Sequence, residues 1–60
     1  MKFIGVTMDR RRAELFKEFL RYKDIYYEPS ECYSRIHIEF RTDKTFEETM
    51  EEFEKWLEED

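Results

Sequence analysis

The chain has 60 residues, a single cysteine, eleven aromatic side chains (six Phe, four Tyr, one Trp) and a net charge of −5 at pH 7. Its length predicts one small domain over residues 1–60, and a lone cysteine excludes an internal disulfide that would stabilise so small a core. The negative charge disfavours a general nucleic-acid binder, and no apolar run approaches the ~20 residues that cross a membrane.

The first two predicted elements are a strand over residues 2–7 and a helix that begins near Arg10. The strand segment KFIGVT is rich in β-branched and aromatic residues. Asp9 is a favourable N-cap, and apolar residues recur at helical spacing through residues 10–23. The apolar face of this helix contains Ala13, Leu15, Phe16, Phe19, Leu20 and Tyr22.

The next two predicted elements are strands separated by a turn. Residues 24–28 form a short strand that Pro29 ends, because proline cannot donate a hydrogen bond to a neighbouring strand. After a turn over residues 29–31, residues 32–41 form the longest strand, with strict alternation. Its inner face is predicted to carry Cys32, Ser34, Ile36, Ile38 and Phe40. Its outer face is predicted to carry Tyr33, Arg35, His37, Glu39 and Arg41.

The last predicted element is a helix that follows Thr45. Thr45 and Glu48 match the capping box, in which each side chain bonds the backbone N–H of the other residue. The helix has a narrow apolar stripe of Phe46, Met50, Phe53 and Leu57, with Thr49 and Trp56 at its border.

The order β-α-β-β-α predicts an α+β fold in two layers. We expect a three-stranded, antiparallel or mixed sheet with strand order 1-3-2 and both helices on one face. This arrangement resembles a ferredoxin-like unit without its last strand, an architectural likeness that implies no function. The other face of the sheet then lacks cover from this chain, and it displays Phe3, Thr7, the polar row of the longest strand, and either Tyr26 or Tyr27.

One candidate binding surface is the acidic face of the last helix. Four glutamates share one sector of this helix, and Trp56 lies at the border of that sector as a candidate aromatic anchor. The four are Glu47, Glu51, Glu54 and Glu58. Glutamates four residues apart repel each other, and acids at a helix C-terminus oppose the macrodipole. Solubility and docking to a basic partner both explain this cost, and the sequence leaves the two readings open.

Two further candidates are the outer sheet face and the start of the first helix. The outer face, with Tyr33, Arg35 and His37, is a solvated surface, a protein or self-contact, or a stacking platform for single-stranded nucleic acid. Arg10, Arg11 and Arg12 form an anion site at the helix N-terminus, pair with glutamates of the second helix, or remain hydrated.

From these patterns we predict a small acidic protein-binding module that is not an enzyme and needs no cofactor or metal. We hypothesise an inhibitor or phage-type modulator that occupies a basic, nucleic-acid-binding surface of a partner protein. The alternative is a homo-oligomer, such as a homodimer, that assembles through the edge of the first strand or the open sheet face. A weaker alternative is single-stranded nucleic-acid binding on that face. One unpaired cysteine and the absence of a signal-like or membrane segment lead us to expect a cytoplasmic protein with no membrane partner.

Overall fold

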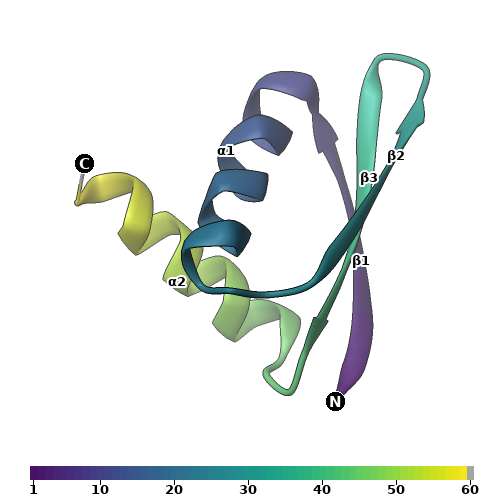
Figure 1. Ribbon diagram of the computed structural model, residues 1–60. Helices are drawn as coiled ribbons and strands as arrows, with labels where there is room; N and C mark the ends of the chain where they lie inside the picture. Colours follow the sequence, from purple (N-terminus) through teal and green to yellow (C-terminus); the bar gives the residue numbers. More distant parts are fainter. Residues whose placement is uncertain (60) are drawn as a thin grey trace.

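The computed structural model describes residues 1–59 and places the predicted elements in the predicted order. Along the chain these are β1 (Lys2–Asp9), α1 (Arg10–Tyr22), β2 (Tyr27–Cys32), β3 (Arg35–Thr42) and α2 (Phe46–Glu58). The sheet has the order β1-β3-β2, and both strand pairs are antiparallel. Figure 1 shows both helices on one side of the sheet and a bare opposite side. The α+β class, the strand order and the placement of the helices are therefore confirmed.

The core lies between β3 and α1. Ile36, Ile38 and Phe40 of β3 are buried, as their alternation predicts. Phe16 of α1 packs edge-to-face on Phe40, with ring centroids 5.3 Å apart. Burial of each such side chain stabilises the fold by about 1.5–3 kcal/mol.

Helix α1 begins at Asp9, whose carboxylate accepts the backbone N–H of Arg12 at 2.8 Å. The buried face of α1 is narrower than predicted, because Leu15 and Tyr22 are exposed. At ~100° per residue, both lie more than about 100° around the helix from the centre of the buried stripe. The four buried residues are Ala13, Phe16, Phe19 and Leu20.

Helix α2 begins with the predicted capping box. Thr45 Oγ1 accepts the Glu48 backbone N–H at 3.1 Å, and Glu48 Oε1 accepts the Thr45 backbone N–H at 3.0 Å. Phe53 is fully buried, and its ring centroid lies 5.0 Å from that of Phe16. Thr49 is the one other buried residue that the described part of α2 contains, so α2 is held mainly on α1 through Phe53. In Figure 1 the C-terminal half of α2 runs away from the sheet.

The predicted boundaries of the middle strands are wrong. Strand β2 spans Tyr27–Cys32 and continues through Pro29, which lies opposite Ile38. Proline is tolerated there because β2 is an edge strand, which pairs on only one side. The turn between β2 and β3 is the pair Tyr33–Ser34, and Tyr33 has a positive φ of 58°.

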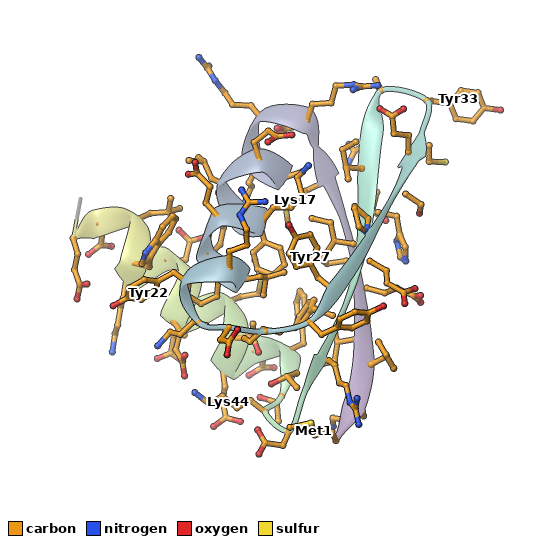
Figure 2. The ribbon with its side chains drawn as sticks, viewed as in Figure 1. Met1, Lys17, Tyr22, Tyr27, Tyr33 and Lys44 are labelled. Carbon is orange, nitrogen blue, oxygen red and sulfur yellow. The ribbon has the colours of Figure 1, made fainter. Side chains whose placement is uncertain are left out.

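This shift moves three residues off their predicted places. Cys32 is exposed and lies opposite Arg35, on the bare face of the sheet, so its predicted inward position is wrong. Ser34 and Tyr33 belong to the turn and not to β3, which begins at Arg35. In Figure 2 the Tyr33 side chain points away from the tip of the hairpin.

Candidate interaction surfaces

The open face of the sheet is organised in four rows that cross the three strands. The register sets these rows, because directly opposite residues point to the same face. In the order β1, β3, β2, they are Phe3–Arg41–Tyr26, Gly5–Glu39–Glu28, Thr7–His37–Ser30 and Asp9–Arg35–Cys32. Tyr26 directly precedes β2, and its carbonyl accepts the backbone N–H of Arg41 at 2.9 Å.

The first row is an exposed aromatic row, which we define as Phe3, Arg41 and Tyr26. Phe3 is 55% exposed and Tyr26 is 57% exposed. Their rings meet edge-to-face, with centroids 6.4 Å apart and planes at 79°. The choice that the sequence left open is therefore resolved: Tyr26 lies on the open face, whereas Tyr27 is half-buried on the helix side.

The Tyr26 ring is fixed by a second contact. Its hydroxyl donates to Glu28 Oε2 at 2.6 Å. This hydrogen bond and the negative charge of Glu28 raise the pKa of Tyr26 above its ordinary value. The ring therefore stays neutral and oriented at the edge of the open face.

The second row is an acidic pair, Glu28 and Glu39, which lie directly opposite each other on β2 and β3. Like charges in this position destabilise a sheet. Gly5, the β1 member of the row, has no side chain that could cover or neutralise this pair. The centre of the open face is thus negative and open to a cation.

His37 lies in the third row, forms a hydrogen bond with Thr7 and lies near Glu39. Its Nδ1 is 3.0 Å from Thr7 Oγ1, and its Nε2 is 3.9 Å from Glu39 Oε2. A Cβ atom added to Gly5 would lie 2.9 Å from His37 Cε1, so the missing side chain of Gly5 leaves room for the imidazole ring. Of the predicted open-face candidates, His37 and Arg35 lie on this face. Tyr33, which is 96% exposed at the hairpin tip, does not.

Two glutamates of α2 form ion pairs with cations of the same chain. Glu54 pairs with Arg12, whose guanidinium also lies over the Phe53 ring at 5.1 Å. Glu52 pairs with Lys23 at 3.6 Å and with Lys44.

The remaining acidic row of α2 consists of Glu47, Glu51 and Glu58. All three are exposed, and within residues 1–59 none forms an ion pair. Trp56 is half-buried, with its ring centroid 5.7 Å from that of Phe19 of α1, so it belongs largely to the packing between the helices. The acidic face is therefore smaller than the sequence suggests.

The three arginines at the start of α1 do not converge. Arg10 pairs with Glu31 of β2 at 3.0 Å, and Arg12 pairs with Glu54 of α2. The predicted pairing with a glutamate of the second helix is confirmed for Arg12. Arg11 is exposed and forms no ion pair within the described residues.

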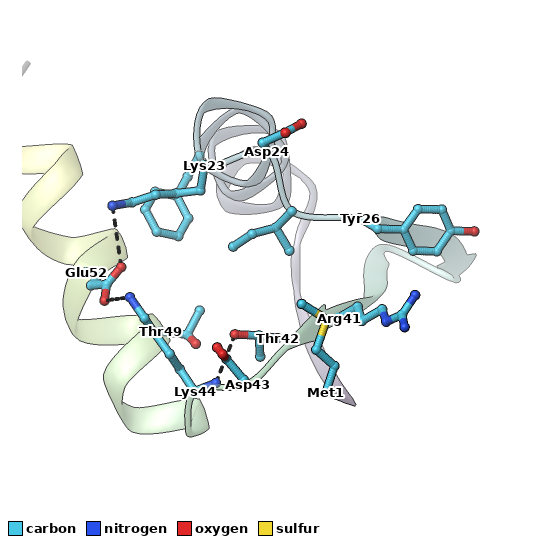
Figure 3. Close-up of a pocket in the computed structure, with 12 residues that line it drawn as sticks. Met1, Lys23, Asp24, Tyr26, Arg41, Thr42, Asp43, Lys44, Thr49 and Glu52 are labelled. Carbon is cyan, nitrogen blue, oxygen red and sulfur yellow. Dashed lines mark hydrogen bonds and ion pairs between the residues drawn. The ribbon is translucent and has the colours of Figure 1, made fainter.

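A cavity of about 430 Å³ opens where β3 leads into α2, as Figure 3 shows. Its wall includes Phe19 and Ile25. At its rim, Glu52 forms ion pairs with Lys23, which directly follows α1, and with Lys44. The hydrogen bond from Lys44 lowers the pKa of Glu52 and raises that of Lys44. The sequence did not indicate this cavity, because its wall comes from four separate segments of the chain.

Neither helix within residues 1–59 is long and apolar enough to cross a membrane. In the same residues, no group of three His, Cys, Asp or Glu side chains is placed to hold a metal ion. The chain matches no protein-family model, no curated protein and no solved structure.

Proposed function

We propose that this chain is a non-enzymatic module that binds a protein partner through the open face of its sheet. The observation that carries the proposal is the exposed aromatic row, in which Phe3 and Tyr26 are more than half exposed on either side of Arg41. Aromatic and arginine side chains supply most anchor residues of protein interfaces. No element within residues 1–59 covers this row.

The charges beside the aromatic row determine the chemistry of the partner. Glu28 and Glu39 face each other one row away from it, and no cation of the row separates them. A lysine or arginine of the partner would relieve their repulsion, while an apolar side chain packs on the Phe3 ring. The partner surface is therefore basic where it meets the acidic pair at the centre of the open face, and apolar where it meets the aromatic row.

Long-range charge favours the same partner. The chain has a net charge of −5, and the acidic row of Glu47, Glu51 and Glu58 adds an outward negative field along α2. Such a field accelerates the encounter with a basic protein and weakens with salt. Basic surfaces commonly bind nucleic acid, so occupation of one by this chain would inhibit that function.

The same charges argue against nucleic acid as the ligand of this face. Phosphate contacts carry most nucleic-acid affinity, and Glu28 and Glu39 would lie against the phosphates of a strand stacked on Phe3 and Tyr26. A protein partner is thus favoured over a single-stranded nucleic acid.

The test begins with affinity capture from the organism that encodes the chain, and it is decided by titration of the purified partner. Binding is measured by calorimetry for the unaltered chain and for Phe3→Ala and Arg41→Ala. We expect each substitution to weaken binding by about tenfold or more, the loss typical of an anchor residue. Tyr33→Ala is the matched control, because it removes an exposed aromatic side chain that lies outside the row.

Two outcomes would refute the open-face contact. One is unchanged affinity of both Phe3→Ala and Arg41→Ala; the other is an equal loss in the Tyr33→Ala control. Replacing Glu47, Glu51 and Glu58 with Lys should reduce the affinity and its dependence on salt. If the affinity is the same after this reversal of charge and at every salt concentration, the partner is not basic.

A further inference from the structure

We infer that the chain forms a symmetric dimer in which β1 pairs antiparallel with β1 of a second copy. The two sheets would join into one six-stranded sheet with all four helices on the same face. The open faces would stay uncovered, so this inference does not depend on the proposed partner contact.

The first argument is the contrast between the two edges of the sheet. The edge strand β2 contains Pro29 and two glutamates, Glu28 and Glu31, which are features that prevent edge-to-edge pairing. The edge strand β1 has neither a proline nor a charged residue from position 3 to position 8. Of the two edges, β1 alone has a continuous run of residues without charged side chains, so its free backbone groups can pair with another strand.

The second argument is the incomplete cover of β1 on the helix side. Ile4 and Val6 face the helices but are half-buried, whereas Ile38 and Phe40 beside them on β3 are fully buried. The nearest apolar residues of α2 do not complete the cover, because α2 packs mainly on α1 and its C-terminal half runs away from the sheet. An additional strand with apolar residues on its helix side would extend the core over this gap.

The third argument is that β1 itself has the residue pattern that the gap requires. With Gly5 opposite Gly5 of the partner subunit, Ile4 lies opposite Val6 of the partner subunit, and Phe3 lies opposite Thr7 of the partner subunit. The apolar residues then stay on the helix side of both copies. The two glycines at the twofold axis place no side chain in the space where the His37 rings lie over β1.

The charges at the ends of β1 agree with the antiparallel direction. Lys2 opens the strand and Asp9 closes it. Antiparallel pairing sets the Lys2 end of one copy beside the Asp9 end of the other, whereas parallel pairing would set like charges together. Arg10, which follows Asp9, is turned toward Glu31 on the opposite edge of the sheet.

The test compares substitutions at two residues of one row. Thr7 and Ser30 both lie opposite His37, Thr7 on the β1 edge and Ser30 on the β2 edge. Sedimentation of the full chain is measured over a range of concentrations for Thr7→Lys, Ser30→Lys and the unaltered protein. We expect a dimer that Thr7→Lys weakens by about tenfold or more and that Ser30→Lys leaves intact.

Salt separates this dimer from the proposed partner contact. Each copy has a net charge of −5, so added salt should strengthen the dimer, while it weakens binding to a basic partner. Concentration-dependent protection of β1 amides from hydrogen exchange reports the same pairing in the unaltered protein, even where Thr7→Lys does not fold. A monomer up to about 1 mM, or equal weakening by both lysine substitutions, would overturn the inference.

The register has its own test in a Cys32→Ser background. Phe3→Cys and Thr7→Cys chains are treated with a short thiol cross-linker, separately and as a mixture. We expect cross-linked dimers only in the mixture, because Phe3 of one copy lies opposite Thr7 of the partner subunit. Cross-linking of either chain alone, or none in a mixture that sediments as a dimer, would exclude this register.

Discussion

At the scale of single residues, Gly5 and His37 form the most tightly constrained contact on the open face. The imidazole ring occupies the place of a Gly5 side chain, and it is held there by Thr7. The role of Gly5 is to leave space for the imidazole ring. The feature of interest at the turn residue Tyr33 is its backbone conformation, with a positive φ.

We expect the effect of Gly5→Ala to depend on His37. In the unaltered chain the new methyl group displaces the imidazole and breaks its bond to Thr7, so the substitution destabilises the fold. In a His37→Ala background the clash is absent, and Gly5→Ala should stabilise by about 0.4–1 kcal/mol by restricting the unfolded chain. Urea unfolding of the four proteins, at a concentration where each is monomeric, measures the coupling. Equal effects in the two backgrounds would contradict the contact.

Tyr33→Asn should stabilise the hairpin. Tyr33 has a positive φ of 58°, which costs most residues about 1–2 kcal/mol but which Asn tolerates. Its side chain is 96% exposed, so little packing is lost. We expect the urea midpoint to rise with an unchanged slope, whereas Ser34→Asn, whose φ is not positive, should leave the midpoint unchanged. A lower midpoint for Tyr33→Asn would indicate a contact that this turn geometry does not contain.

At the scale of the elements, α2 depends on very few core contacts. Phe53 packs between Phe16 and Phe19, and the rest of the apolar stripe of α2 is half-buried or exposed. Phe53 is the fully buried apolar side chain of α2, so it should contribute most to the docking of this helix, with Met50, Trp56 and Leu57 adding partly buried contacts.

Phe53→Ala should remove about 3–5 kcal/mol, a loss comparable to the whole stability of a domain this small. We expect the substituted chain to lose its near-ultraviolet circular dichroism and its cooperative melting transition at 25 °C. Phe53→Leu keeps most of the volume and should stay folded, and Phe46→Ala, at a more exposed site of the same helix, should have a much smaller effect. Cooperative melting of Phe53→Ala at an unchanged temperature would show that α2 is held elsewhere.

Features that depend on residues close together in the sequence were predictable. Features that depend on where a strand lies in the sheet were not. The Thr45–Glu48 capping box and the alternation of Ile36, Ile38 and Phe40 depend on neighbouring residues, and both are confirmed. Pro29 was misread because proline ends an interior strand but is tolerated at an edge, and strand position is a property of the whole sheet.

The candidate sites show the same division between local and long-range information. The sequence indicated an uncovered face with Phe3 and Arg41 on it, but the pairing of these residues with Tyr26 needed the register. Likewise, the glutamate pattern of α2 and the pairing of Arg12 with one of these glutamates were predictable, whereas the ion pair of Lys44 with Glu52 was not.

At the scale of the whole molecule, ion pairs connect α2 to α1 and to the segments that flank the two helices. Glu52 joins α2 to Lys23 and Lys44, and Arg12 joins α1 to Glu54. Two carboxylates of α2 have a pKa below the ordinary value of 4.5. Glu52 belongs to these ion pairs, and Glu48 belongs to the capping box of α2. The cause is the Lys44 hydrogen bond for Glu52 and the Thr45 backbone N–H for Glu48.

Acid should therefore destabilise the fold. A lowered pKa in the folded state gives stability that is present above pH 4.5 and is lost as the pH falls through the lowered values. We expect the melting temperature to fall below about pH 5, and to fall less in a chain with Glu48→Gln and Glu52→Gln. Added salt should reduce the part due to Glu52, an exposed ion pair, more than the part due to Glu48. A melting temperature with the same pH dependence in both chains would contradict this assignment.

The topology of the sheet has a consequence for the order in which the protein is built during synthesis. The only partner of β1 in the described sheet is β3, and Lys2 pairs with Thr42. The ribosome releases β1 before β3, so both edges of β1 stay unpaired until β3 has emerged as far as residue 42. In contrast, β2 and β3 can pair at once through their two-residue turn. The nascent chain is thus most open to capture by another strand, or by a chaperone, during that interval.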